Sequence, residues 1–264
     1  MKQIRVEWQG PTGPRWVMDG PVDDIGGAVL IQPAGLVADV ERATAVTSHG
    51  VGVTLGPVVV GEMTGSLTLA LRGDDRVSVG EVHSQVERCF STVLPGELLV
   101  VDSDRNRWRV EALLARRPDP PERSPWAPGR GVLVWEPELR APGGVWAGDP
   151  QIVEPEGGVA TVFNPGSLTV FPLVVWSGSG CVIETPAGVL VTLPTATGVR
   201  KLSTDPGRGF VVTDEEGHVD TGTWAEMRGL PVHGELAPHS EARWRVVSGQ
   251  VHFEVIPLTE SPWR

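Results

Sequence analysis

The segment Asp102-Ser103-Asp104-Arg105-Asn106 has the alternating oxygen-bearing side chains with which a calcium-binding loop begins. An EF-hand loop would next require a glycine, where this chain has Arg107, and a glutamate at its twelfth position, where this chain has Leu113. The flanking residues have the pattern of strands, whereas helices flank an EF-hand loop. We therefore interpret the segment as a solvated hairpin turn and not as a metal site.

Paired carboxylates could supply the acid and the base of a glycosidase. The candidates are Glu136 with Glu138, the run Asp214-Glu215-Glu216, and Asp23-Asp24. Pro137 separates the first pair, and the other two have the composition of hairpin turns. Catalysis is therefore not favoured at any of the three places.

Histidine and cysteine show no metal-ligand spacing in this chain. No HxH, HxxxH or HExxH pattern joins the 6 histidines, which are His49, His83, His218, His233, His239 and His252. Cys89 and Cys181 lie in different halves of the chain and neither belongs to a CxxC pair, so a structural zinc site is not expected. A disulfide between them stays open, but two reduced, buried thiols are favoured.

Motifs for nucleophilic catalysis and for nucleotide binding are also absent from the sequence. It contains no GxSxG and no P-loop, and Gly50-Val51-Gly52 lacks the third glycine of a dinucleotide-binding turn. We therefore expect no enzyme, and no catalytic, cofactor-binding or metal-binding residues. A cell-wall hydrolase stays open only because a β-sandwich can assemble a site from residues that are distant in sequence.

Tryptophans could instead form a platform on which sugars stack. Those considered lie in both halves of the chain: Trp126, Trp135, Trp146, Trp176, Trp224, Trp244 and Trp263. Trp244 stands between Arg243 and Arg245, so it points inward if the arginines point to water. Packing in a core or at a subunit interface is favoured over contact with carbohydrate.

The composition favours many short strands joined by tight turns. The chain has 264 residues with 33 glycines and 24 prolines, and 40% of it is hydrophobic, which argues against disorder. In the first half, strands are expected at residues 4–8, 15–18, 28–32, 51–55, 57–61, 65–73, 97–101, 107–114 and 131–135. The clearest is 65–73, where Leu67, Leu69 and Leu71 alternate with small or polar residues.

One helix interrupts this series of strands. Ser78 and Glu81 form a capping-box signature, and apolar residues then recur at three- and four-residue spacing as far as Val93. Pro95-Gly96 would stop the helix, which is therefore expected over residues 78–93 and should pack on the preceding sheet.

A glycine- and proline-rich stretch at residues 141–150 is the best candidate for a linker. We place a domain boundary near residue 145, which gives an N-terminal domain at 1–144 and a C-terminal domain at 145–264. The C-terminal domain is expected to be an antiparallel sandwich, with strands at 167–178, 181–193, 199–204, 209–214, 217–222 and 251–257 and around Trp244.

The chain is acidic, with a formal net charge of −11. Proteins that wrap nucleic acid need a basic face, and anionic membrane surfaces also attract basic segments, so neither partner is expected. The N-terminal residues alternate between charged and apolar types and show no signal-peptide pattern. The longest apolar run, 168–176, is too short to span a bilayer.

The order of these elements resembles siphophage distal tail proteins, a minor tail protein family. In the first half the resemblance rests on Trp8-x-Gly10-x-x-Gly13-x-x-Trp16-x-Met18, on Gly35-Leu36, and on the strand, capped helix and strand pair that follow. In the second half it rests on the turn at Asn164, the strand containing Pro172 and ending at Gly178, the hairpins at 201–223, and Leu236-Ala237-Pro238 before the Trp244 strand. Pro165 after Asn164, and His239 after Pro238, depart from the family at single turns.

This resemblance implies a mainly β chain, with a β-sandwich-like N-terminal domain that carries one helix and a galectin-like or jelly-roll C-terminal sandwich. It also implies a structural virion protein of the tail tip, assembled in the host cytoplasm. The N-terminal domains would form a ring, typically a hexamer, that joins the tail tube to the hub and passes the genomic DNA without binding it specifically. The C-terminal domain would carry other tip proteins. The alternative is a carbohydrate-binding sandwich that attaches the tip to cell-wall glycans.

Overall fold

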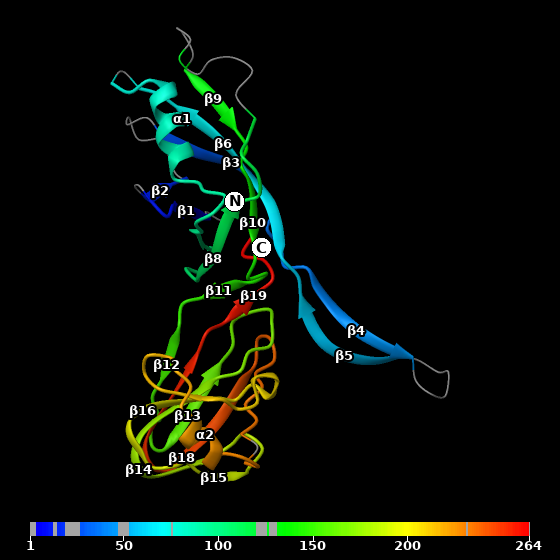
Figure 1. Ribbon diagram of the computed structural model, residues 1–264, viewed down its shortest axis with the longest axis vertical. Helices are drawn as coiled ribbons and strands as arrows, with labels where there is room; N and C mark the ends of the chain where they lie inside the picture. The colour runs from blue at the N-terminus through cyan, green and yellow to red at the C-terminus, as the bar shows by residue number, and fades with distance from the viewer. Residues whose placement is uncertain are drawn as a thin grey trace. The chain divides into compact units, whose positions relative to one another are not determined.

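The computed structural model describes residues 4–12, 15–18, 27–46, 53–74, 76–119, 126, 131–230 and 232–263 (Figure 1). The chain divides into two compact units, one of Met1–Ala147 with Thr259–Arg264 and one of Gly148–Leu258. The sequence places a single boundary near residue 145. The observed division needs two, because the last residues of the chain return to the first unit.

The first unit contains a continuous antiparallel sheet. Its strands are β1 (Arg5–Gln9), β2 (Arg15–Val17), β3 (Gly27–Gly35), β6 (Met63–Arg72), β7 (Gly96–Val101), β8 (Arg107–Leu114), β9 (Val132–Trp135) and β10 (Glu138–Ala141). They follow the order β2-β1-β7-β8-β10-β6-β3, and β9 also pairs with β6. The expected alternation along β6 is confirmed, since Leu67, Leu69 and Leu71 are all fully buried.

The helix α1 (Val79–Arg88) begins with the expected capping box. The Ser78 hydroxyl accepts the backbone N–H of Glu81, and the Glu81 carboxylate accepts the N–H of Ser78. Val79, Val82 and Val86 form the buried stripe. The expected end near residue 93 is wrong.

Cys89 is the C-cap of α1, and the chain then leaves the helix axis. The Ser91 carbonyl accepts the N–H of Leu114, and the Ser91 hydroxyl accepts those of Val93 and Leu94. These bonds compete with another helical turn. Val93, the last residue of the expected stripe, is 79% exposed.

Aromatic rings fill the core of the first unit. Trp8 stacks on Phe90 with ring centroids 4.4 Å apart, and Phe90 meets Trp135 edge to face. The Trp8 indole N–H donates to the Cys89 carbonyl over 2.9 Å. This bond satisfies a buried donor and fixes the turn at the end of α1 to β1.

A long hairpin extends the first unit beyond β3 and β6. The two strands pair as far as Gly35 opposite Gly65, and the chain then continues into β4 (Val40–Val46) and β5 (Val53–Val60). β4 and β5 pair only with each other among the described strands (Figure 1). The sequence predicted an irregular segment after Gly35-Leu36. Gly35 and Leu36 both adopt positive φ, which interrupts the strand. The irregular part is short, since strand β4 begins at Val40.

The second unit is also antiparallel, and β18 (Glu241–Val255) is its longest strand. Its other strands are β12 (Gln151–Val153), β13 (Val159–Phe163), β14 (Leu173–Glu184), β15 (Leu190–Thr192), β16 (Ala196–Ser203) and β17 (Val212–Thr213). They follow the order β12-β18-β14-β16-β17, with β13 on β18 and β15 on β14. Two further short strands, β11 (Trp146–Gly148) and β19 (Leu258–Thr259), pair with each other, and β11 also pairs with β8 in the sheet of the first unit.

Two expectations for the second unit are wrong. The strand expected to end at Gly178 continues to Glu184, because Gly178 takes φ 81° and a change of register absorbs the irregularity. The strand expected at 217–222 is reduced to one bridge at Val219, since Asp220 caps the short helix α2 (Thr221–Glu226). A 3₁₀ turn, η1 (Pro206–Arg208), precedes it.

Asn164 holds the turn that directly follows β13. Its fully buried side-chain amide donates to the carbonyls of Leu168, Leu236 and Ala237, and its oxygen accepts the N–H of Gly166. The prediction of a mainly β fold, with one helix in the N-terminal part and a β-sandwich-like C-terminal part, is confirmed. Neither α-helix in the described residues is long and apolar enough to cross a bilayer.

Candidate functional site

The predicted hairpin turn at Asp102 is present between β7 and β8, and its carboxylate is fully engaged. One oxygen accepts the N–H groups of Asp104 and Asn106, and the other accepts the Asn106 amide and the Trp108 indole N–H. Burial acts most strongly and would raise the pKa of Asp102, but the combined hydrogen bonds lower it below its ordinary value. The carboxylate therefore shapes a turn.

The carboxylate pair Glu136 and Glu138 lines a pocket of about 330 Å³ in the first unit. Both oxygens of Glu138 bind Arg116, each over 3.0 Å, and Glu136 accepts the Ser66 hydroxyl over 2.9 Å. The structure thus brings the two side chains to one pocket and gives each a structural partner. Asp23-Asp24 and Gly50-Val51-Gly52 lie outside the described residues.

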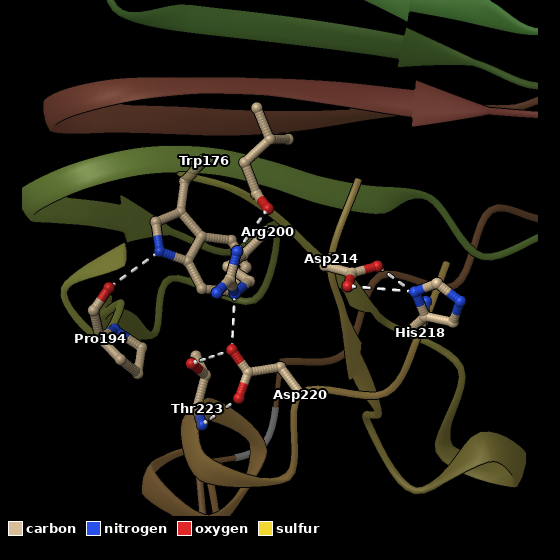
Figure 2. A network of polar contacts seen from close by, with 8 residues as sticks. Trp176, Pro194, Arg200, Asp214, His218, Asp220 and Thr223 are labelled. Atoms are coloured by element: carbon tan, nitrogen blue, oxygen red, sulfur yellow. Dashed lines mark hydrogen bonds and ion pairs between the residues drawn. The ribbon is translucent and has the colours of Figure 1, made fainter. Parts of the chain in front are cut away.

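The run at Asp214 forms the predicted turn, which is closed by hydrogen bonds between Asp214 and His218 (Figure 2). Asp214, Glu216 and His218 each offer a ligand atom within 4.8 Å of the others. The His218 side chain is 80% exposed, and its Nδ1 lies 3.4 Å from an Asp214 oxygen. Sequence reasoning noted the acidic residues but not the histidine, although their spacing is local.

Cys89 and Cys181 are both buried, form no disulfide with each other, and belong to different units. The favoured prediction of reduced thiols therefore agrees with the structure. His83 lies on the buried side of α1. The Nδ1 atom of His252 lies 3.9 Å from a carboxylate oxygen of Glu154, and its Nε2 atom lies 3.7 Å from one of Glu254. His49 lies outside the described residues.

Core packing is confirmed for Trp135, Trp146, Trp176 and Trp244, all at most 5% exposed. Trp224, within α2, is different because it is partly exposed. Its indole N–H donates to the Gly209 carbonyl over 3.0 Å. With Phe210, Met227 and Leu230 it lines a pocket of about 370 Å³, which we call the Trp224 pocket.

A polar network fixes the start of α2 to the sheet (Figure 2). Arg200 on β16 donates from Nε to Asp220 over 2.6 Å, and Asp220 accepts the N–H and the hydroxyl of Thr223. The Thr223 backbone N–H, then its hydroxyl and Arg200, lower the pKa of Asp220 to about 2. Sequence reasoning missed this network, for which the helix-capping spacing of Asp220 and Thr223 was the available signal.

Edge strands of the sheet in the first unit, and the hairpin formed by β4 and β5, carry exposed apolar side chains. Within the described residues β9 pairs only with β6, and it exposes Val132 and Val134. Ile31 on β3 is 57% exposed, and Val59 at the end of β5 is 56% exposed. Unpaired edges of this kind are templates for pairing with another chain.

These features define a class by fold: a two-unit, mainly β protein with a capped helix and a long hairpin in its first unit and a β-sandwich-like second unit. The Dit protein of phage SPP1 has this fold. Its crystal structure covers 97% of this chain and 98% of its own, with a TM-score of 0.59 and 10% sequence identity. That structure is described as a paradigm of the hub adsorption apparatus in phages that infect Gram-positive bacteria.

Structures of the phage P2 baseplate in its activated conformation, one with calcium and one with strontium, are more distant. They match at TM-scores of 0.47 and 0.44, each with 8% identity, and cover 96% of this chain and 98% and 97% of theirs. No protein-family model and no curated protein sequence matches the chain. The shared fold with SPP1 Dit is therefore what the comparisons show.

Proposed function

We propose that this chain is a structural protein of a bacteriophage tail tip. The observation that carries the proposal is the correspondence of both units, over almost their whole length, to SPP1 Dit. A match at 10% identity shows the fold alone. The exposed strand edges of the first unit and the hairpin of β4 and β5 are further support for an assembly role. No enzymatic activity is expected, and this expectation stays a prediction.

The proposed assembly is a hexameric ring of this chain, located in the virion between the tail tube and the hub. The hairpin of β4 and β5, which we call the β4–β5 ribbon, supports this assembly. An isolated two-stranded hairpin is marginally stable in water, so pairing with a neighbouring copy would stabilise it. Exposed apolar residues on β9 and at the end of β5 supply further contact surface. Ring closure would cover such edges on every copy.

The net charge of −11 suits a ring through which DNA passes without adhering to the wall. The partners proposed are further copies of this chain, the tail tube protein, the hub and other tip proteins. Assembly would take place in the host cytoplasm.

Removal of the ribbon tests the ring. The N–H of Gly61 donates to the carbonyl of Asp39 over 2.9 Å, so residues 40–60 can be replaced by an Asn-Gly turn without stretching the chain. The full chain should form rings by native mass spectrometry and electron microscopy, and the shortened chain should be a folded monomer. Rings of unchanged size from the shortened chain would exclude the ribbon as the ring contact.

The carbohydrate-binding alternative is not favoured by the second unit. Of its tryptophans, Trp176 and Trp244 are buried, and the indole N–H of Trp224 is already bound to Gly209. A sugar-binding platform needs several polar groups beside the ring, and Arg228 is the one polar side chain among those that line the Trp224 pocket. Glycan binding therefore enters below as an outcome of an experiment.

A further inference from the structure

We propose that the Trp224 pocket binds an aromatic or branched aliphatic side chain of a partner protein, next to a carboxylate that Arg228 holds. The inference deepens the proposed function and rests on it, since a tail-tip protein must hold other proteins. The second unit would bind a partner protein at this pocket, and the bound segment would carry an apolar side chain beside an acidic one.

The pocket is apolar and of the right size. Phe210 and Trp224 are half-buried, Met227 is buried beneath them and Leu230 is 38% exposed at the rim. Pockets for drug-sized molecules span about 300–1,000 Å³. The Trp224 pocket, at about 370 Å³, lies at the small end of this range and has room for one large side chain with its neighbour.

The polar groups of the pocket argue for a side chain over a sugar. The one donor on its aromatic rings, the Trp224 indole N–H, is bound to the Gly209 carbonyl. Among the lining side chains only Arg228 remains as a polar group. A sugar ring would lose the water on its several hydroxyls and recover few hydrogen bonds, which is unfavourable.

Arg228 indicates which charge the bound segment should carry. Its side chain is exposed, and it forms no ion pair within the described part of the chain. A guanidinium binds a carboxylate through two parallel hydrogen bonds, so a partner segment with an acidic residue beside its apolar one complements the pocket.

Contacts within the second unit fix both sides of the pocket. Gly209 and Phe210 both have positive φ, at 64° and 54°, and this conformation is costly for a bulky residue such as Phe210. The Phe210 ring is held edge to face against His233 at 5.3 Å. Arg200 and Asp220 hold α2 on the other side of the pocket. A site organised in advance loses less entropy on binding.

The test uses the full chain and three acetylated, amidated tetrapeptides: Gly-Trp-Asp-Gly, Gly-Trp-Lys-Gly and Gly-Ala-Asp-Gly. The chain has 10 tryptophans, and Trp224→Phe identifies the indole N–H signal of Trp224 in a two-dimensional NMR spectrum. Gly-Trp-Asp-Gly should shift that signal with a dissociation constant of about 1 mM. Gly-Trp-Lys-Gly should bind about fivefold more weakly, as expected for a lost surface ion pair.

Two variants and a control separate binding from folding. Arg228→Glu should reverse the preference between the acidic and the basic peptide, whereas Arg243→Glu, on strand β18 and not among the lining residues, should leave it unchanged. Phe210→Asn should fold, because asparagine tolerates positive φ, and should lose peptide binding. Reversed preference in both arginine variants would overturn the proposal.

Other outcomes would also overturn it. The Trp224 indole signal would then shift with neither tryptophan peptide, or would shift equally with Gly-Ala-Asp-Gly. It could also shift with a tetramer of N-acetylglucosamine in place of the peptides, or on raising the protein concentration alone. The last two would assign the pocket to glycan or to a second copy of this chain. Ring formation by the same variants is scored separately, so failure of the ring and failure of the pocket are distinguishable.

Discussion

Arg200 on β16 donates a 2.6 Å hydrogen bond from Nε to Asp220, the residue that caps α2. Asp220 simultaneously accepts the backbone N–H of Thr223, so one carboxylate joins the sheet to the helix. The Trp224 side chain follows at the next position and lines the pocket. The contact between Arg200 and Asp220 therefore positions the surface proposed to bind a partner.

The stability of the second unit should depend on the ionisation of Asp220. Its pKa falls from an ordinary value of 3.8 to about 2 on folding, chiefly because Thr223 donates to it. A lowered folded-state pKa stabilises the protein above the unfolded pKa and loses this effect as pH falls. Asp220→Asn should lower Tm at pH 7, and the difference from the wild type should shrink between about pH 4 and pH 2. Thermal unfolding across this range measures it, and a constant difference would contradict the account.

Two buried tryptophans should respond differently to loss of the indole N–H. Trp176 donates to the Pro194 carbonyl over 2.8 Å, whereas the Trp244 N–H has no partner in the described structure. Trp176→Phe should therefore cost about 1–3 kcal/mol more free energy of unfolding than Trp244→Phe, because it leaves a carbonyl unsatisfied while Trp244→Phe removes an unsatisfied donor. Urea unfolding of the two variants gives the comparison. Equal costs would show that the hydrogen bond to Pro194 contributes nothing.

A negative charge introduced at position 164 should lower the stability of the protein. Its amide faces the carbonyls of Leu168, Leu236 and Ala237, and an aspartate there would oppose them with a buried negative charge. Asn164→Asp should therefore destabilise the chain by about 3–5 kcal/mol. Asn164→Ala, which loses the bonds without adding charge, should cost less. An aspartate variant at least as stable as the alanine variant, measured by urea unfolding at pH 7, would contradict this view of the turn.

Local patterns predicted the elements whose signals are local. The capping box at Ser78 located the start of α1, and the alternation of Leu67, Leu69 and Leu71 gave the buried face of β6. The end of α1 was missed because the Ser91 carbonyl is taken by Leu114, which is close only in the folded chain.

The pocket and its supports were harder to predict. Phe210 carries no turn signal, and its positive φ depends on neighbours such as His233. Arg200 meets Asp220 only once β16 is paired with β17, where the Val212 carbonyl accepts the N–H of Asp220, so their sequence positions do not indicate a contact. The return of Thr259–Arg264 to the first unit is likewise a tertiary feature.

Self-assembly of the full chain is the central claim, and electron microscopy of the purified protein with native mass spectrometry tests it most directly. The account predicts closed sixfold rings at high concentration, and the same chain in purified virions at the tail tip. A protein that stays strictly monomeric at high concentration and is absent from virions would contradict it.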